Sequence, residues 1–424
     1  MVGEWHKAPF EKLLIEPVRN GIYKTKGFHG RGAKIVNMGE LFAHPRLRAV
    51  PMKRVELNES ERSRFLLSEG DLIFARRSLT AEGAGKCSVV LELDEATTFE
   101  SSIIRARPDP EKANPLYLYY FFNSPSGFHS LDTIRRQVAV AGITGGDLAK
   151  LEIPTPPLTE QRAIAHILGT LDDKIELNRR RNKTLEAMAR ALIQDWFVDF
   201  GPVRAKMAGQ EPYLAADLWQ LFPDRLDIEG KPEGWTFEKL GDFVEIFDSR
   251  RVPLSGKQRA ERKGPYPYHG AAGVMDSVDD FLFDGIYVLL GEDGSVVRAD
   301  GRPYTQYVWG KFWVNNHAHV LRGKGISNET LLIFLNQCDV ARFVTGAVQP
   351  KLSQGNLKAI PFLNAGQVLL TRFGEFVDPL FAQIRDATEE SRTLAQLRDT
   401  LLPKLISGEL RIADAEKFIE RGGL

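Results

Sequence analysis

Two long stretches of the chain carry apolar residues at steps of three and four, the spacing of one buried seam on an α-helix. The first stretch runs from Leu158 to Phe200, with apolar positions Ile164, Leu168, Leu171, Ile175, Leu185, Leu192 and Trp196. The second has Phe373, Val377, Leu380, Ile384, Leu394, Leu397 and Leu401. A helix of about 43 residues is about 65 Å long and needs a partner for its apolar stripe. We therefore predict two long helices packed on each other as an antiparallel coiled coil.

The ends of the first helix are marked by residues that interrupt helices. Prolines at 154, 156 and 157 prevent an earlier start, Thr159 is suited to be the N-cap, and Gly201-Pro202 is expected to close the helix.

The two stretches are copies of each other. A shift of 209 residues places Gly146, Leu148, Ile164, Leu171, Ile175, Thr184, Leu185 and Leu192 on Gly355, Leu357, Phe373, Leu380, Ile384, Thr393, Leu394 and Leu401. The seam becomes polar or small at Asn178 and Asn182 in one copy and at Ala387 and Ser391 in the other. Upstream, Phe10-Glu11-Lys12-Leu13 recurs as Phe237-Glu238-Lys239-Leu240, each after a tryptophan, Trp5 or Trp235. Such a repeat fixes the architecture before any local motif does.

The repeat predicts globular regions alternating with helices. The expected bounds are a first globular domain over 1–157, a central helix over 158–200, a linker over 201–232, a second globular domain over 233–366, a C-terminal helix over 367–412 and a tail over 413–424. Both globular regions have short strand-like runs, such as 72–75, 101–105, 287–290 and 318–321, followed by apolar helical segments at 116–123 and 328–336. The fold class is therefore α+β (mixed α/β), with a pseudo-twofold internal repeat. Each globular region ends near a Gly-rich loop, at 140–146 and at 345–355.

Composition restricts the function classes. The 424 residues have a formal net charge of zero and two cysteines without a metal-binding spacing, which argues against a disulfide framework and a structural zinc site. The sequence shows neither an apolar signal-peptide core nor a run long enough for a membrane span, so a cytoplasmic location is expected. Charge is uneven, however: nine Lys or Arg against one acid lie between Arg19 and Arg54. A local basic patch binds phosphate even on a neutral chain.

DNA contacts are expected from residues that suit phosphates and base edges, namely Lys and Arg for phosphates and Arg, Asn, Gln and Ser/Thr for bases. In the first globular region these candidates are Lys24, Lys26, His29, Arg31, Lys34, Arg76, Arg77, Ser78 and Thr80. In the second region they are Arg250, Arg251, Lys257, Arg259, Tyr268, His269, Gln349 and Lys351, and 249–251 and 255–259 are expected to play the same part as the basic segments 24–32 and 75–80 of the first region. The alternative for any single basic residue is a solvated surface charge.

The sequence shows no catalytic motif. Residues 81–87 lack the first glycine of a phosphate-binding loop and have Cys87 where Ser or Thr would bind magnesium. Residues 123–125 lack the second proline and the aromatic residue of an amino-methyltransferase tetrad, and the eight histidines have no metal-ligand spacing. The sequence thus predicts a non-catalytic reader with no catalytic, cofactor-binding or metal residues.

The chain resembles the specificity subunit of a type I restriction–modification enzyme. The motifs that carry the resemblance are Pro157-Leu158-Thr159-Glu160-Gln161-Arg162 at the start of the first helix, Trp196-Phe197-Val198-Asp199-Phe200 at its end, residues 401–411, and the run at 346–354. The second helix departs from the pattern, since Asn364-Ala365-Gly366-Gln367 replaces the Pro-Leu-Thr-Glu-Gln opening.

The resemblance implies two target recognition domains, each reading half of a bipartite double-stranded DNA site, and helices that set the spacer. It also implies docking of two modification (methyltransferase) subunits and of restriction subunits. S-adenosylmethionine, ATP and magnesium would bind those partners, not this chain. Two alternatives remain: a stand-alone DNA adenine methyltransferase with degenerate motifs, and a coiled-coil scaffold that does not bind DNA.

Overall fold

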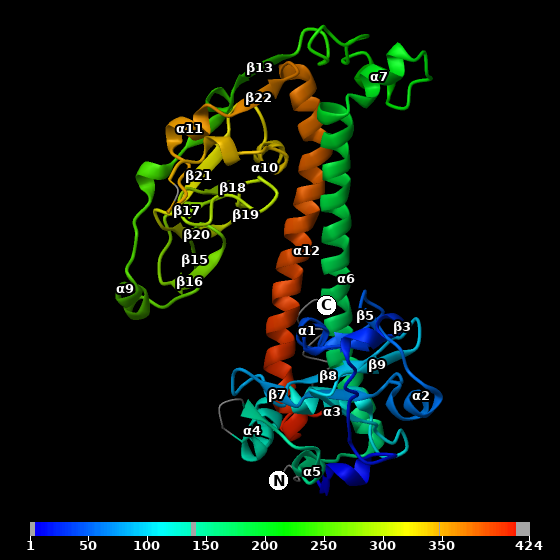
Figure 1. The fold of residues 1–424 in the computed structure, drawn as a ribbon. Coiled ribbons are helices and arrows are strands. Elements are labelled where there is room, and N and C mark those ends of the chain that lie inside the picture. The colour runs from blue at the N-terminus through cyan, green and yellow to red at the C-terminus, as the bar shows by residue number, and fades with distance from the viewer. Residues whose placement is uncertain (1–4, 137–140, 347, 413–424) are drawn as a thin grey trace. The chain divides into compact units, whose positions relative to one another are not determined.

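The computed structural model describes residues 5–136, 141–346 and 348–412, so the predicted tail 413–424 and parts of the two predicted loops (Val140, Ala347) lie outside the described residues. The chain divides into two compact units, residues 1–177 with 389–424, and residues 178–388 (Figure 1). Each unit contains strands and helices, which confirms the mixed α+β class. The units cut both long helices, whereas the sequence-based domain bounds keep each helix whole; those bounds stay a prediction.

Both predicted long helices are present. Helix α6 spans Leu158–Ile193 and continues as a π-helical turn over Gln194–Val198, and α12 spans Gln367–Ser407. The start at Leu158 makes the N-cap prediction for Thr159 wrong: that residue lies in the first turn, after Pro157, whose carbonyl accepts from the Gln161 amide.

The helix ends also differ from the prediction. The first helical segment ends at Val198, and Phe200, a non-glycine residue with a φ of 55°, precedes a new helix, α7 (Gly201–Met207), which Gly201-Pro202 begins. Proline is tolerated there because the first turn of a helix has no acceptor for its missing amide. Helix α12 ends before 412 because Gly408 takes a left-handed φ of 73°, the usual C-terminal stop.

In the first unit, the N-terminal half of α6 packs against the C-terminal half of α12. Ile164, Leu168 and Leu171 share one buried core with Leu401 and Leu405. Polar contacts between the helices flank this core, Lys174 with Glu390 at 3.3 Å and Arg398 with Asp172 at 2.6 Å.

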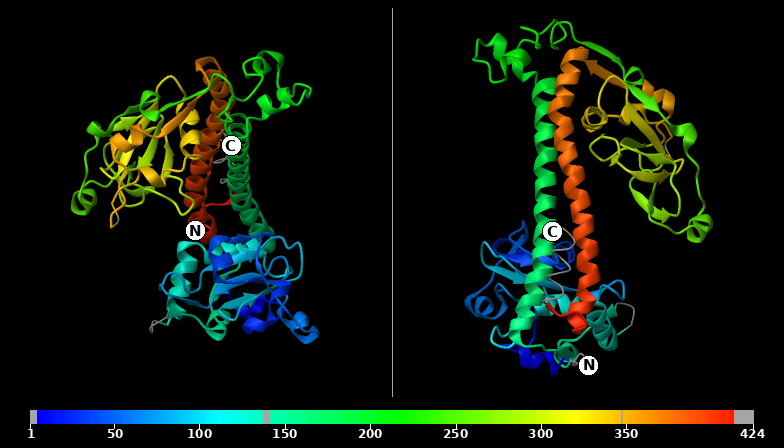
Figure 2. Two further views of the ribbon diagram at one scale, coloured as in Figure 1. Left: turned by 45° about the horizontal axis from the view of Figure 1, so that its top comes forward. Right: turned by 180° about the vertical axis from the view of Figure 1, so that it is seen from behind.

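In the second unit the other halves of the same two helices pair. Leu185, Ala189 and Ile193 share a core with Phe373 and Val377, and Arg181 donates to Gln383 at 2.6 Å. The helices run antiparallel and side by side in each unit (Figures 1 and 2), which confirms the predicted partner. The pairing covers the seam that would otherwise be exposed to water.

The globular module of the first unit is built on a five-stranded sheet in the order β2-β10-β6-β8-β4 and a three-stranded sheet in the order β5-β3-β9. Its strands are β1 Lys7–Pro9, β2 Arg19–Asn20, β3 His29–Val36, β4 Arg46–Leu47, β5 Lys53–Val55, β6 Leu72–Ala75, β7 Arg77–Ser78, β8 Cys87–Val90, β9 Thr97–Phe99, β10 Ile103–Ala106, β11 Ala141–Gly142 and β12 Glu152–Pro154. Its helices are α1 Met38–Ala43, α2 Glu59–Phe65, α3 Pro115–Phe122, α4 Pro125–Ile134 and α5 Gly145–Ala149.

The globular module of the second unit has two four-stranded sheets, β14-β21-β18-β19 and β16-β15-β20-β17. Its strands are β13 Thr236–Lys239, β14 Val244–Ile246, β15 Tyr266–His269, β16 Val274–Val278, β17 Phe283–Asp284, β18 Tyr287–Gly291, β19 Thr305–Val308, β20 Lys311–Val314, β21 Ala318–Gly323 and β22 Pro361–Asn364. Its helices are α8 Ala216–Trp219, α9 Gly256–Glu261, α10 Asn328–Leu335 and α11 Gln354–Lys358.

The hydrogen bonds correct one of the sequence matches between the copies. The amide of Phe10 donates to the carbonyl of Leu151, and the amide of Leu240 donates to that of Ile360, both at 2.8 Å. Leu151 and Ile360 are repeat equivalents, so Phe10 corresponds to Leu240 and not to Phe237. The tetrapeptide match was three residues out of register, which is why Phe10 is fully buried while Phe237 is 62% exposed.

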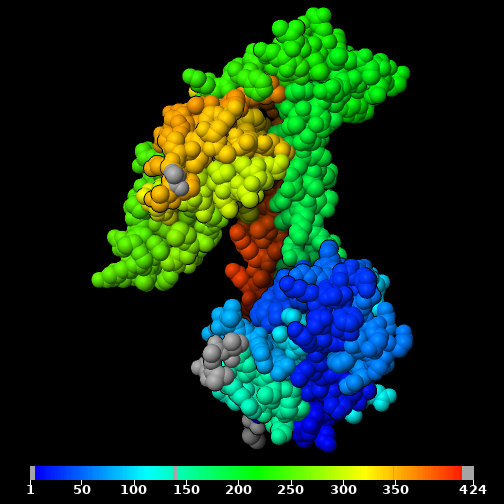
Figure 3. Space-filling model, in the orientation of Figure 1, coloured from blue at the N-terminus to red at the C-terminus, as the bar shows by residue number. Residues whose placement is uncertain are grey.

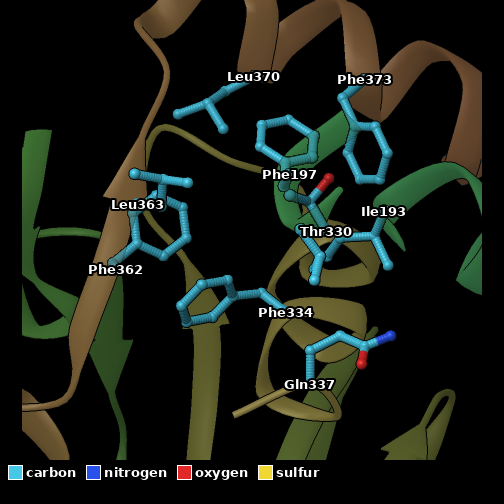
Figure 4. Close-up of a pocket in the computed structure, with 10 residues that line it drawn as sticks. Ile193, Phe197, Thr330, Phe334, Gln337, Phe362, Leu363, Leu370 and Phe373 are labelled. Carbon is cyan, nitrogen blue, oxygen red and sulfur yellow. The ribbon is translucent and has the colours of Figure 1, made fainter. Parts of the chain in front are cut away.

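The second unit has a cavity of about 60 Å³. The equivalent space within the first unit is filled by one of that unit's own side chains. The lining of the cavity includes Phe197, Thr330, Phe334, Leu363 and Phe373 (Figure 4). In the first unit, helix α3 is capped in the same way as α10, and its third residue is a tyrosine, Tyr117, where α10 has Thr330. The Tyr117 hydroxyl donates to the carbonyl of Pro154, the equivalent of Leu363, so the ring spans the space that is hollow in the second unit.

Candidate nucleic-acid interface

In the first unit, strand β6 leads into a turn that lies against a closed loop. Arg77 of β7 pairs with Gly142 of β11, and Gly142 also bridges Arg136, which closes the loop between 136 and 142. The amide of Ile143 then donates to the carbonyl of Arg76 at 3.0 Å, and Thr144 caps helix α5. Both ends of this loop are therefore fixed by backbone hydrogen bonds.

The second unit repeats this arrangement at the equivalent positions. Thr345 bridges Lys351, and the amide of Leu352 donates to the carbonyl of Glu292 at 2.8 Å, directly after strand β18. Lys351 also bridges Asp293, and Ser353 caps helix α11. Residues 136–142 are called loop 1 and residues 345–351 loop 2, and the 209-residue offset maps one loop onto the other.

This equivalence identifies the residues that the second copy has at the place of the paired arginines. The same hydrogen bonds that define the two loops place Arg76 opposite Glu292 and Arg77 opposite Asp293 in the two copies. The second copy therefore has two acids where the first has two arginines. The segments 249–251 and 255–259 lie elsewhere, in the turn after β14 and in helix α9, and their part in DNA contact stays a prediction.

The turn beside loop 1 exposes an apolar tip among polar groups. Leu79 is 94% exposed, Arg77 is exposed, and Arg76 donates to the carbonyl of Ser101 at 3.2 Å. The hydroxyls of Ser78 and Thr80 accept backbone amides within the turn. Within the described residues, neither arginine forms an ion pair with an acid.

Loop 2 carries a different set of exposed side chains. Val348 is fully exposed, and Gln349 lines a hollow of about 530 Å³ together with Val274, Met275 and His317. This segment lies at the surface of the second unit, in the orange part of the space-filling view (Figure 3).

The acids beside loop 2 already have partners within the protein. Glu292 pairs with Arg251 at 2.7 Å and with Lys351 at 3.2 Å, and Asp293 pairs with His317. Carboxylates paired in this way do not demand a cation from a ligand.

Most of the basic candidates near the N-terminus pair with acids. Lys24 contacts Glu61 at 2.7 Å and lies over the Phe28 ring, while the backbone carbonyl of Lys24 contacts His29. Arg31 is 72% exposed but pairs with Glu56, whose pKa is lowered chiefly by that hydrogen bond.

Lys34 and Lys26 represent the two extremes of this basic region. Lys34 is buried between Asp94 at 2.8 Å and Glu95 at 3.4 Å, and the hydrogen bond to Asp94 raises its pKa. Lys26 is exposed and has no acid partner among the described residues. Lys26 is thus best placed of these four cations to reach a phosphate.

The basic and aromatic candidates of the second unit are also largely structural. Arg259 pairs with Asp276 and lies over Tyr268, whose side chain is buried, as is that of His269. Arg250 donates to the Leu282 carbonyl at 2.8 Å, and Lys257 is exposed on α9. The assignment of the candidate residues to DNA contact stays a prediction.

A buried polar cluster that the sequence did not reveal lies under loop 2. His319, fully buried, directs Nδ1 to Asp248 at 2.6 Å and Nε2 to the carbonyl of Leu352 at 2.7 Å. Gln354 also donates to Asp248 at 2.6 Å. Burial acts to raise the pKa of Asp248, but the hydrogen bond from His319 and neighbouring charges outweigh it and hold that pKa below its usual value.

Asp248, Glu292 and His319 are close enough together to hold a metal ion. Both ring nitrogens of His319 already face oxygen acceptors, however, and Arg251 supplies the positive charge. The cluster therefore works as an ion-pair network that fixes the end of loop 2. Its only sequence signal was a histidine inside an apolar strand.

None of the described helices combines the length and the apolar character that crossing a membrane requires.

Comparisons with known proteins place these features in a family. The family model described as the type I restriction modification DNA specificity domain matches residues 23–187 and 232–363, one match for each module. The chain is 29% identical over 314 residues to the type I restriction enzyme MjaIX specificity subunit of Methanocaldococcus jannaschii, covering 70% of this chain and 69% of that one. It is 23% identical over 360 residues to the HindI specificity subunit of Haemophilus influenzae, covering 70% and 77%.

Among solved structures, the type I restriction-modification S subunit from M. genitalium has a similar fold, with a TM-score of 0.58 and 17% identity over 95% of this chain and 96% of that one.

Proposed function

The chain belongs to the family of type I restriction modification DNA specificity domains and is a specificity subunit, and from this premise we propose that each of its two modules reads one half of a bipartite site in double-stranded DNA. The predicted family is thereby confirmed. Reading DNA requires donors and acceptors at base edges and cations at phosphates.

One observation carries the proposal: in both copies the same clamped loop lies against the residues that follow the same strand, but the exposed side chains differ. A shared framework with different surfaces is what two readers of different half-sites need. Arg77 and Leu79 are exposed in the turn beside loop 1, and Val348 and Gln349 are exposed on loop 2 itself.

We further propose that the chain works in a complex with two modification subunits and with restriction subunits. S-adenosylmethionine, ATP and magnesium would then be bound by those partners, and this chain would act in the cytoplasm without catalytic residues of its own. The paired helices would set the length of the unread spacer between the half-sites. The two alternatives, a stand-alone methyltransferase and a scaffold without a DNA role, have no support among the relatives, which are named as specificity subunits.

The test is a methylome comparison with exchanged modules. Residues 1–157 are replaced by the equivalent region of a relative, and the chimera is expressed with its modification subunits. We expect one half of the methylated motif to change while the other half and the spacer stay the same. A simultaneous change of both halves would refute the assignment of one reader to each module. As a control, the purified chain alone should transfer no methyl group to DNA.

A further inference from the structure

We propose that the two modules read chemically different half-sites: the segment beside loop 1 reads a guanine, and loop 2 reads A·T base pairs. This inference rests on the proposed function. It follows from one pair of equivalent positions in the repeat. The first module has Arg76-Arg77 there and the second has Glu292-Asp293, so the side chains are of opposite charge.

The first module presents an exposed hydrogen-bond donor, which suits the acceptors on the major-groove edge of guanine. The backbone of Arg77 is fixed by its pairing with Gly142, while its side chain is exposed. A guanidinium has only donors, and guanine presents two acceptors, O6 and N7, in the major groove. Adenine presents one acceptor and one donor, and cytosine a donor, so either base would leave an arginine donor unpaired or repelled.

Arg76 is held differently, since it donates to the carbonyl of Ser101. Its fixed charge lies next to Arg77 and adds positive potential at this place without an acid partner among the described residues. Arg77 is therefore the residue we assign to the base, and Arg76 the one that supports it.

The second module has an amide and apolar groups at the equivalent place. Gln349 can donate to adenine N7 and accept from adenine N6 with one side chain. Val348 on the same loop, and Val274 and Met275 on β16, are exposed apolar groups of the kind that contact the thymine methyl. Exposed apolar side chains grouped around a hollow mark an interaction surface.

The acids of the second module disfavour guanine. Glu292 and Asp293 stand at the places of Arg76 and Arg77, so the second module lacks there the guanidinium donors that would pair with guanine O6 and N7. Arg251 and Lys351 pair with Glu292, and His317 contacts Asp293, so these acids already have partners within the protein. Because the acids beside it are paired, loop 2 does not strongly repel DNA phosphates, and its exposed side chains favour A·T pairs.

The experiment selects sequences from duplexes in which both half-sites are random, using the complex of the full chain with its modification subunits. We expect one half-site to contain an invariant guanine and the other to consist mainly of A·T pairs. Arg77→Ala should remove the preference for that guanine alone, and Gln349→Ala should relax an adenine in the other half. Arg64→Ala, a matched change of an exposed arginine on α2, should leave both halves unchanged. A melting curve of each variant verifies that it is folded.

Base analogues then test the atoms. Replacing the selected guanine by 7-deazaguanine, which lacks the N7 acceptor, should weaken binding of the wild-type complex by about tenfold or more and leave the Arg77→Ala complex unaffected. Uracil in place of thymine should weaken binding at the other half in the wild type but less in Val348→Ala. Enrichment of a bipartite site whose second half is rich in G·C, or a guanine preference that survives Arg77→Ala, would overturn the inference and leave the proposed function intact. No enrichment of any bipartite sequence would instead refute the proposed function.

Discussion

Asn178 donates a hydrogen bond from Nδ2 to the carbonyl oxygen of Ala387, which lies 209 residues later in the chain, at 3.3 Å. The same offset relates the two copies of the repeat. In an antiparallel helix pair, a residue can face its own repeat equivalent at one place only, because the numbering rises along one helix and falls along the other. Asn178 and Ala387 mark that place, and the flanking contacts Arg181–Gln383 and Lys174–Glu390 are repeat equivalents of each other.

This register determines how the helices can be lengthened. Inserting four residues after Asn178 and four after Ala387 places the two insertions opposite each other, so the pairing within each unit keeps its register. Four residues add about 6 Å of helix, and a base pair occupies about 3.4 Å. We expect the spacer of the methylated site to grow by one or two base pairs in methylome data.

The matched control is the same insertion after Asn182 and after Ser391. These residues are repeat equivalents, but Asn182 lies opposite Thr388, at 3.1 Å, and not opposite Ser391. The insertions would therefore displace residues 174–182 and 383–391 against each other by four residues, while the pairing on either side of this central stretch keeps its register. The loss of the central contacts should lower the melting temperature. An unchanged spacer in an active, folded complex with the opposed insertions would show that the helices do not set its length.

Lys24 and Lys26 should behave differently although they are two residues apart. Lys26 is exposed without an acid partner in the described part of the chain, whereas Lys24 is held by Glu61 and Phe28. Lys26→Ala should weaken binding to all duplexes alike and lower the slope of log K against log salt by about one. Lys24→Ala should change the melting temperature more than the slope. Equal slopes for the wild type and Lys26→Ala, measured across a salt series, would contradict a phosphate contact at Lys26.

The stability of the second unit should depend on Asp248 in acid. An aspartate whose pKa is lowered by folding adds stability above its unfolded pKa, here near the ordinary value of 3.8, and that contribution is lost as the pH falls through the folded value. We expect the melting temperature to fall as the pH is lowered from about 5 to about 3. Asp248→Asn should be less stable by about 2 kcal/mol at neutral pH and lose less on acidification.

Asp284→Asn, a change of an exposed aspartate on β17, serves as the control and should follow the wild-type pH profile. A parallel loss of stability in Asp248→Asn and the wild type on acidification would exclude Asp248 as the titrating group.

The cavity at Thr330 offers a paired test of packing. Because Tyr117 fills the equivalent space in the first unit, Thr330→Tyr should fill the cavity, with its hydroxyl close to the carbonyl of Leu363, and stabilise the second unit by about 1 kcal/mol. Tyr117→Thr should open a cavity in the first unit and cost about 3 kcal/mol. Urea denaturation measures both changes, and a destabilising Thr330→Tyr would show that the cavity cannot accept the ring.

The sequence predicted the parts of the structure that depend on long patterns. The 209-residue offset identified both helices and their partner, because burial of a seam constrains many positions at once. The match of Phe10–Leu13 with Phe237–Leu240 was wrong because four matching residues are too few to fix an alignment. The tryptophans Trp5 and Trp235 were the better guide, since the same offset in residue number relates Phe10 to Leu240.

The candidate site was less predictable, since its chemistry depends on contacts between distant residues. From the sequence alone Lys34 is a candidate phosphate ligand, but in the structure it pairs with Asp94 and Glu95. The substitution of Arg76-Arg77 by Glu292-Asp293 could not be read from an alignment either, because the copies have different lengths between the strand and the loop. Only the backbone hydrogen bonds identify these pairs as equivalent.

Loops 1 and 2 are each clamped at both ends by the backbone, at Arg136–Gly142 and at Thr345–Lys351. The clamps use main-chain atoms, which every residue possesses, so point mutations at the exposed positions do not remove them. Selection can thus alter the chemistry of one loop by single substitutions while the fold and the other loop stay as they are. A lineage carrying this chain can therefore acquire new specificities in small evolutionary steps, one half of the target at a time.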